Sequence, residues 1–176
     1  MKQGEKGFTF IELIIAATII SLVAGAAAIA TFQVLKGTER NNNYITAVHQ
    51  VHNAGFWISR DAQMADRIIA DNLTSPDFLV INWTEWDDPE NPVYHSVTYF
   101  FEDMTDGIGK LKRTHWSSAG ANEETLVTKH IYYAPSDPED TTKANYQAPV
   151  LTVQLTALSE ETMESREYRI SHRPNF

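Results

Sequence analysis

Cysteine is absent from this chain of 176 residues, so no disulfide can hold its fold together and no thiol can carry an anchoring lipid. Basic residues are also few, since 14 Lys and Arg stand against 23 Asp and Glu and give a net charge of −9 at pH 7. Proteins that bind nucleic acids need basic residues to displace counterions from phosphate. The composition therefore argues against nucleic acid as a partner and predicts a domain held together by packing alone.

Sequence signals of catalysis are missing as well. The chain contains no HExxH zinc motif, no glycine-rich phosphate loop and no nucleophile elbow. His49 and His52 are three residues apart and could share a metal on one helix face, but the sequence supplies no third ligand. Two exposed helix histidines explain this spacing more simply. We therefore predict no catalytic residue, no metal ligand, and a protein that is not an enzyme.

Acidic residues cluster in three expected turns, and carboxylate oxygens are ligands that calcium prefers. The clusters are Asp87/Asp88/Glu90, Asp103/Asp106 and Asp137/Glu139/Asp140. None of them has the spacing of an EF-hand loop, and acidic residues are common in turns. We expect no cofactor, with calcium in one of these turns as the alternative that stays open.

The one long apolar stretch runs from Gly7 to Phe32 and reads GFTFIELIIAATIISLVAGAAAIATF. After Gly7 it holds 25 residues, and Glu12 is the only charged residue among them. At about 1.5 Å per residue, a helix of this length crosses the roughly 30 Å hydrocarbon core of a bilayer. The stretch therefore predicts a membrane helix over residues 8–32.

Glu12 needs an explanation, because a carboxylate inside a membrane is costly and calls for a partner. No Lys or Arg lies elsewhere in the stretch, so the carboxylate is protonated, lies near the membrane interface, or meets a cation from another chain. A cut after Gly7 would supply such a cation, since the new α-amino group of Phe8 would lie at the same depth in a neighbouring copy. This hypothesis makes Glu12 an assembly residue that pairs between subunits.

A short basic leader that ends in Gly7 and is followed by F-T-F-I-E resembles the type III signal of type IV pilins and type II secretion pseudopilins. The usual form of that signal is G-F-T-L-I-E, so Phe10 stands where Leu is usual. The resemblance implies cleavage between Gly7 and Phe8 by a prepilin peptidase, N-methylation of Phe8, and pairing of Glu12 with the amino terminus of an adjacent subunit. The implied partners are other pilin or pseudopilin subunits, the peptidase, the membrane and an inner-membrane assembly platform.

An ordinary signal peptide or a plain single-pass anchor is the alternative for the same stretch. A signal peptide has an apolar region of about 7 to 15 residues that ends at a small-residue cleavage site. This stretch is longer and carries its polar break near the beginning, although Ala24 to Ala30 could imitate such a site. Its length favours the pilin-type signal.

These observations divide the chain into a leader at 1–7, a transmembrane and assembly helix at 8–32, and an extracytoplasmic globular domain at 33–176. The length allows one modest domain beside the membrane helix. Lys2 and Lys6 precede the apolar stretch, which indicates a cytoplasmic N-terminus. We expect a single-pass protein of the inner (cytoplasmic) membrane whose C-terminal domain lies outside and joins a periplasmic or cell-surface filament.

An amphipathic helix is predicted over residues 44–70. Apolar or small residues recur there at alternating spacings of four and three, namely Tyr44, Val48, Val51, Gly55, Ile58, Ala62, Ala65 and Ile69. The charged residues Arg60, Asp61, Asp66 and Arg67 fall off this stripe, so the helix should be half buried.

Six strands are predicted after this helix, at residues 78–84, 95–102, 110–116, 126–133, 150–158 and 166–173. Asp106 and Gly107 mark a turn, and the longest loop is expected from Ala134 to Ala148. The predicted fold is α+β, with the long helix packed on an antiparallel meander. This arrangement is similar to the pilin fold.

Two segments, Trp57 to Ala65 and Ser171 to Asn175, resemble the J-type minor pseudopilins and the W-type minor pilins. Major pilins often carry a proline in the membrane helix, and residues 8–32 contain none. The resemblance implies a minor subunit of a type II secretion pseudopilus or a type IV pilus, at or near the filament tip. Two alternatives stay open: a pilus subunit for DNA uptake or adhesion, and a membrane-anchored binding or enzymatic domain.

Overall fold

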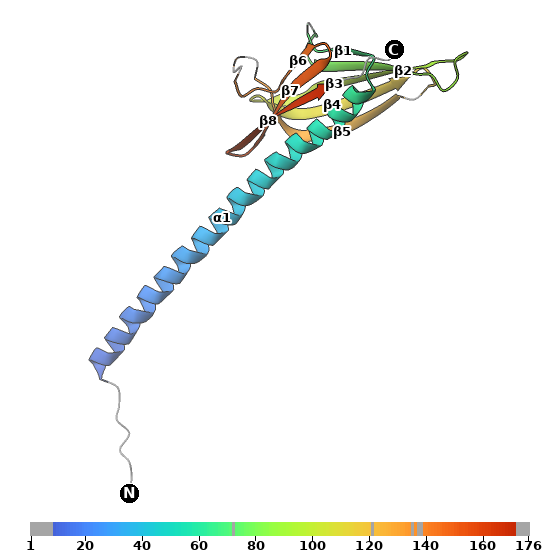
Figure 1. The fold of residues 1–176 in the computed structure, drawn as a ribbon. Coiled ribbons are helices and arrows are strands. Elements are labelled where there is room, and N and C mark those ends of the chain that lie inside the picture. The colour runs from blue at the N-terminus through green and yellow to red at the C-terminus, as the bar shows by residue number, and fades with distance from the viewer. Residues whose placement is uncertain (1–8, 72, 121, 135, 137–138, 172–176) are drawn as a thin grey trace. The chain divides into compact units, whose positions relative to one another are not determined.

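The computed structural model describes residues 9–71, 73–120, 122–134, 136 and 139–171. The chain divides into two compact units, one up to Asn42 and one from Asn43 onward. A long helix, α1 (Phe10–Met64), makes up the described part of the first unit and continues into the second. Within the described residues, eight strands follow it in the second unit (Figure 1).

Helix α1 is continuous over 55 residues because its sequence holds no strong helix breaker. The segment contains no proline, and the Thr9 carbonyl before it accepts the backbone N–H of Glu12 at 3.1 Å and of Leu13 at 3.3 Å. Gly37 and the three asparagines at 41–43 are poor helix formers, yet this polar segment is helical throughout.

The end of α1 differs from the prediction, because the helix ends at Met64 and not near residue 70. Arg67–Ile69 instead form a short edge strand, β1, which pairs antiparallel with β2 (Asp77–Glu85). Ile68 is buried and lies opposite Ile81, so it packs in the core as part of the sheet and not as part of the helix. A strand of three residues is too short to show a period of two in the sequence.

The sheet is antiparallel throughout, and most of its strands have nine or more residues. Its remaining members are β3 (Val93–Thr105), β4 (Ile108–Ser117), β5 (Asn122–Tyr132), β6 (Lys143–Gln147), β7 (Val150–Ser159) and β8 (Thr162–Ser171). Neighbours follow the order β1-β2-β3-β4-β5-β7-β6, and β8 pairs with β7. A long N-terminal helix whose second part packs on a curled antiparallel sheet is the predicted α+β, pilin-like fold (Figure 1).

The strand prediction missed β6 as well as β1, whereas the six strands that it named pair antiparallel in consecutive order, as a meander requires. Strand β6 lies inside the segment predicted as the longest loop, and it pairs with β7 from Lys143↔Gln154 to Gln147↔Val150. Ala144 and Tyr146 pack against the core from this strand. Five residues with only two packing positions give too weak an alternation to be separated from a loop by pattern.

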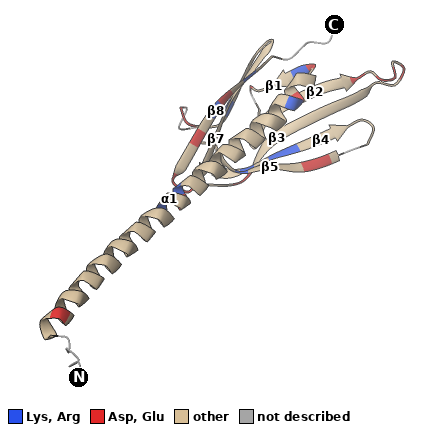
Figure 2. Ribbon diagram, turned by 60° about the horizontal axis from the view of Figure 1, so that its bottom comes forward, with Lys and Arg blue, Asp and Glu red and all other residues tan. Residues whose placement is uncertain are grey.

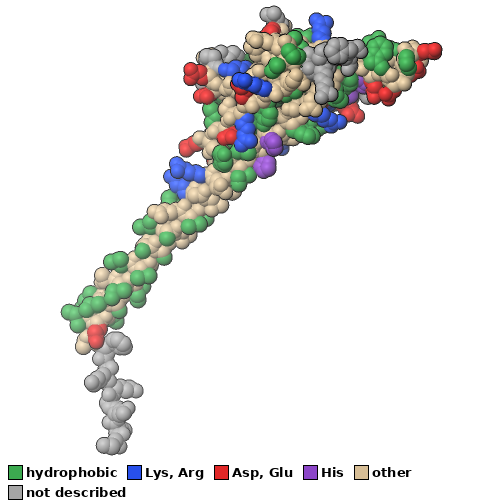
Figure 3. Space-filling model, viewed as in Figure 1, with side chains coloured by type: hydrophobic (Ala, Val, Ile, Leu, Met, Phe, Trp, Pro, Cys, Tyr) green, Lys and Arg blue, Asp and Glu red, His purple; other side chains and the backbone are tan. Residues whose placement is uncertain are grey.

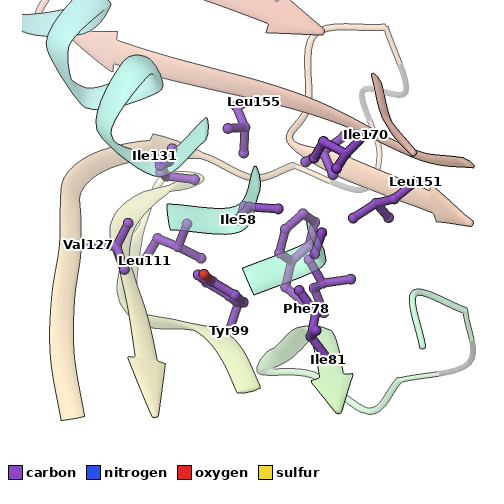
Figure 4. Close-up of a cluster of buried hydrophobic side chains, with 14 of the residues drawn as sticks. Ile58, Phe78, Ile81, Tyr99, Leu111, Val127, Ile131, Leu151, Leu155 and Ile170 are labelled. Carbon is purple, nitrogen blue, oxygen red and sulfur yellow. The ribbon is translucent and has the colours of Figure 1, made fainter. Parts of the chain in front are cut away.

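The buried face of α1 is the one that the helical stripe predicted. Val51, Ile58 and Ala62 are fully buried, whereas Tyr44 at the start of the stripe is 47% exposed. Facing side chains of the sheet complete the core. The largest fully buried ones are Leu79 and, labelled in Figure 4, Tyr99, Ile81, Leu111, Ile131, Leu151 and Leu155. Each such side chain contributes about 1.5–3 kcal/mol by leaving water, so this core fixes the second part of α1 on the sheet.

Strands β3 and β4 are joined by Asp106 and Gly107, which confirms the predicted turn. Both residues have positive φ, 51° and 80° respectively. A two-residue turn with positive φ at both positions matches the right-handed twist of its strands, and Asp-Gly is a preferred pair for it.

Gly55 lets the Tyr168 ring of β8 lie directly on α1. A Cβ at position 55 would overlap this ring, whose hydroxyl donates to the Val51 carbonyl at 3.4 Å.

We expect Gly55→Ala to lower the free energy of unfolding by about 1–2 kcal/mol, since overpacking outweighs the better helix propensity of alanine. Urea unfolding of the full chain in detergent micelles measures this change.

The reason for the Gly55 effect can be tested by removing the ring. In a Tyr168→Ala background, Gly55→Ala should become neutral or stabilising by up to about 1 kcal/mol, because only the propensity gain is left. Gly37→Ala is the matched control, as a Cβ there would meet nothing within 4 Å. An equal loss from Gly55→Ala with and without Tyr168 would contradict the packing explanation.

Candidate assembly site

Helix α1 begins with a reciprocal cap between Thr9 and Glu12. The Glu12 Oε2 atom accepts the backbone N–H and the hydroxyl of Thr9, both at 2.8 Å, and the Thr9 Oγ1 atom lies 3.4 Å from the Glu12 backbone N–H. This arrangement is a capping box, in which a threonine and a glutamate three residues later satisfy the free N–H groups of a helix start. Thr9 was not among the predicted site residues, although the spacing T-x-x-E before an apolar run signals such a cap.

Glu12 keeps one acceptor available in this geometry. Both of its recorded side-chain bonds end on Oε2, and Oε1 has no recorded partner among the described residues. A carboxylate can accept on either oxygen, so an amine from another chain could bind Oε1 without breaking the cap. The predicted cleavage and methylation positions, Gly7 and Phe8, lie outside the described residues.

The first part of α1 exposes large apolar side chains from Phe10 to Leu35, and Figure 3 shows them along the face in view. By length and composition α1 is long and apolar enough to cross a membrane, and its most apolar 18 residues are not buried by any of the described residues. In Figure 2 the acidic colour marks the first turn of α1, and the helix is then uncharged as far as Lys36. This apolar helix fits membrane anchoring.

Polar side chains within the apolar helix are satisfied by the helix itself. Three hydroxyls donate to the carbonyl four residues earlier: Thr18 to Ile14 at 2.8 Å, Ser21 to Ala17 at 2.7 Å, and Thr31 to Ala27 at 2.9 Å. Such internal bonds leave no hydroxyl donor unsatisfied in lipid. A Cβ at Gly25 would meet nothing within 4 Å, so this small residue is open to the close approach of another helix.

A buried ion pair ties α1 to the sheet in the second unit. Asp61 accepts Arg113 Nε on Oδ2 at 2.7 Å and Arg113 Nη2 on Oδ1 at 3.0 Å, and its Oδ2 also accepts the Tyr99 hydroxyl at 2.5 Å. The Asp61 and Arg113 side chains are 1% and 8% exposed. The Arg113 guanidinium also lies 5.2 Å from the centre of the Trp57 ring. Trp57 and Asp61, one turn apart on α1, therefore both contact Arg113.

The burial of Asp61 corrects the sequence analysis, which placed it off the buried stripe together with Arg60. Its charge is tolerated because the Arg113 guanidinium and the Tyr99 hydroxyl donate hydrogen bonds to both carboxylate oxygens. Burial, together with the Asp61 carboxylate, raises the pKa of Tyr99, so Tyr99 stays protonated and donates. Arg113 and Tyr99 carry no sequence signal of this pairing, since they lie on two different strands.

A second polar cluster lies on the same sheet face. His95 Nδ1 and His115 Nε2 are 3.1 Å apart, His95 Nε2 contacts the Glu85 carboxylate at 3.1 Å, and the Trp83 ring stacks on both imidazoles. Burial lowers the pKa of His115, and the nearby charges of Arg113 and His95 act in the same direction. Within the described residues, no group of three His, Cys, Asp or Glu could hold a metal ion.

Stability should depend on pH through His115. Its lowered pKa means that the unfolded chain binds a proton more readily, so the free energy of unfolding should fall as the pH drops below about 6.5. His115→Gln should flatten this dependence, which urea unfolding at about pH 7.5 and about pH 5.5 would measure. In the control His130→Gln, at an exposed position of β5, the free energy of unfolding should still fall at low pH because His115 is retained. A fall of equal size in the His115→Gln variant would contradict this assignment.

In the acidic turns for which calcium was the open alternative, some carboxylates bind other groups of the chain. Asp88 accepts the Glu90 backbone N–H and the Asn91 amide, both at 3.0 Å, and Asp103 pairs with Lys110. Asp137 lies outside the described residues. The absence of a cofactor therefore stays a prediction, with calcium as the open alternative. His49 and His52 gain no third ligand within the described chain.

Comparison with known families matches residues 2–28 to a family model described as the prokaryotic N-terminal methylation motif. No curated protein and no solved structure matches the chain. The matched motif, the apolar helix and the pilin-like fold support a subunit of the type IV pilin or pseudopilin kind. The motif implies, in general terms, assembly with other pilin subunits and the action of a prepilin peptidase.

Proposed function

We propose that the chain is a minor pilin or pseudopilin that a prepilin peptidase cuts between Gly7 and Phe8, with N-methylation of Phe8. The methylation motif over residues 2–28 is the observation that carries this proposal. The exposed apolar side chains of α1 support it, because a filament of parallel subunits would cover them with equivalent helices. The leader would be lost, and the apolar helix would move from the bilayer into the filament core.

Glu12 would set the position of each subunit along the filament. Its Oε1 atom is available to accept the Phe8 amine of a neighbouring subunit, while Oε2 holds the Thr9 cap. A charge pair of this kind specifies register and partner orientation more than it adds affinity. The N-terminus would lie in the cytoplasm before assembly, and the sheet domain would lie outside the inner membrane.

A low-abundance place at or near the filament tip is the subtype that we favour. The absence of proline from α1 supports a minor subunit over a major one. The Trp57 to Ala65 segment that resembles J-type and W-type subunits includes Trp57 and Asp61, which contact Arg113 from α1. The second segment of that resemblance, at 171–175, lies outside the described residues except for Ser171.

One set of experiments can test both whether the chain enters a filament and whether that filament serves secretion or piliation. Cells that carry a tagged copy are sheared, and the filament fraction and membrane fraction are probed for the tag beside a known major subunit. We expect the chain in the filament fraction at a small fraction of the major subunit, and loss of protein secretion or piliation when its gene is deleted. A chain found only in the membrane, with secretion, piliation and DNA uptake unchanged by the deletion, would contradict the proposal.

A further inference from the structure

Four side chains form a continuous row across strands β1 to β4. The register places Arg67 opposite Asn82, Asn82 opposite Ser96, and Ser96 opposite Trp116. Side chains directly opposite each other on neighbouring strands share one face and lie about 4.5–5.5 Å apart at Cβ. Thr84 opposite Tyr94 forms a second, shorter row two residues further along β2 and β3.

These rows lie on the sheet face that does not carry the core. Ile81 and Val97 alternate with Asn82 and Ser96 along the strands and are fully buried in the core under α1. Successive side chains of a strand point to opposite faces, so Asn82 and Ser96 point away from that core. The rows therefore lie on the outer face of the sheet, where Asn82, Thr84 and Ser96 are partly exposed.

A groove of 340 Å³ lies over these rows. Its lining includes Arg67, Asn82, Thr84, Tyr94, Ser96 and Trp116 of the rows, and Asp66, Trp83 and His95 beside them. Tyr94 and Trp116 are 53% and 48% exposed, so both rings offer apolar surface to a ligand in the groove. Strands are spaced by about 4.8 Å, so Arg67 and Trp116 stand about 14 Å apart with only two small polar residues between them. The groove therefore has one aromatic side, a polar floor and an end that carries both charges, Asp66 and Arg67.

The polar groups of the groove have unused hydrogen-bonding capacity. Within the described chain, no hydrogen bond or ion pair of the side chains of Arg67, Asn82, Thr84 and Ser96 is recorded. Hydroxyl and amide groups both donate and accept, and the guanidinium offers several donors in a fixed plane. A ligand that fits must combine an apolar face for the two aromatic rings with many hydroxyl-type partners for the floor.

We propose that this groove binds a neutral carbohydrate chain, with its sugar rings against Trp116 and Tyr94 and its hydroxyls on Asn82, Ser96 and Arg67. Sugars fit because their C–H faces pack on aromatic rings while their edges exchange hydrogen bonds. The site goes beyond the filament role and does not depend on it, since every lining residue belongs to the second unit.

Charge decides between a neutral and an anionic polymer. The chain carries a net charge of −9, and the connection that follows β2 adds Asp87, Asp88 and Glu90 near this end of the sheet. A polyanion would be repelled by these carboxylates and by Asp66 in the groove lining, which Arg67 alone among the lining Lys and Arg residues opposes. A neutral glycan meets no such penalty.

The binding test uses the full chain in micelles of a detergent without a sugar headgroup, since maltoside headgroups would compete. Isothermal titration is carried out with hexamers of β-linked glucose, of β-linked N-acetylglucosamine and of α-linked mannose, and with oligogalacturonate as the anionic comparison. We expect at least one neutral hexamer to bind and oligogalacturonate to bind at least tenfold more weakly than that hexamer.

Trp116→Ala and Tyr94→Ala should each weaken this binding by at least tenfold, and Asn82→Ala by a smaller factor. Trp86→Ala is the matched control, because Trp86 is 58% exposed near the same end of the sheet but does not line the groove. Thermal unfolding of each variant shows whether the fold is kept. No binding of any neutral hexamer, or binding that Trp116→Ala and Tyr94→Ala leave unchanged, would overturn the proposal, and tighter binding of oligogalacturonate would overturn its neutral character.

Discussion

Replacing Glu12 by glutamine is expected to leave membrane insertion intact and to lower the amount of the subunit in filaments roughly tenfold or more, since a charge-assisted bond between subunits is lost. Glutamine can still accept from Thr9 at the N3 position of a capping box, so the helix start is kept. The measurement compares the ratio of filament-bound to membrane-bound subunit in sheared cells for the wild type and the variant.

Two further variants separate the charge of Glu12 from its capping role. Glu12→Ala removes both and should lower incorporation at least as much as Glu12→Gln. Glu39→Gln removes a charge from an exposed position of the same helix and should leave incorporation unchanged. Normal incorporation of Glu12→Gln together with a defect in Glu12→Ala would mean that the cap matters and that the charge pair between subunits does not.

Replacing Asp61 by alanine is expected to lower the free energy of unfolding by about 3–5 kcal/mol, because it leaves the Arg113 guanidinium buried without its carboxylate. The same change removes the acceptor of the Tyr99 hydroxyl. Since domains are stable by only about 5–15 kcal/mol, this one substitution would bring the sheet domain close to unfolding. Urea unfolding followed by tryptophan fluorescence measures the loss.

A paired variant tests whether the loss comes from the unpaired charge. Asp61→Leu combined with Arg113→Met removes both charges with side chains of similar bulk, and it should recover most of the stability lost by Asp61→Ala. Arg60→Ala is the neighbouring control, since Arg60 is exposed and only lies 5.6 Å over the Trp57 ring, and its cost should stay below about 1 kcal/mol. A cost below about 1 kcal/mol for Asp61→Ala would contradict the role of this ion pair in holding α1 on the sheet.

The parts of the fold that depend on local pattern could be read from the sequence. The apolar run of residues 8–32 and the stripe around Val51, Ile58 and Ala62 repeat over many residues, so length and a helical period define them. The Asp106–Gly107 turn was equally predictable, because its backbone demands residues that tolerate positive φ.

The buried polar contacts could not be read in this way. Asp61, Tyr99 and Arg113 lie on α1, β3 and β4, and only the folded sheet brings them together. A charged residue beside an apolar stripe looks solvent-exposed until its partner is known. The same reason applies to the groove over β1 to β4, since its row of residues exists only through the register of four strands.

The N-terminal site was predicted from a motif and not from geometry. Gly7 and Phe8 lie outside the described residues, so their processing stays a prediction that rests on the motif at residues 2–28. The structure adds the Thr9–Glu12 cap, which explains how a carboxylate at the start of an apolar helix can serve the helix and still offer one oxygen to a neighbour.

The mass of the N-terminal peptide, measured on protein purified from its native membrane, tests the central claim most directly. We predict a peptide that begins at Phe8 and is heavier than its sequence by one methyl group. That result would place the chain in the prepilin pathway and leave the choice of machine to the deletion tests. A peptide that begins at Met1, or one cut within Ala24 to Ala30, would contradict the account and return the chain to the class of anchored or secreted domains.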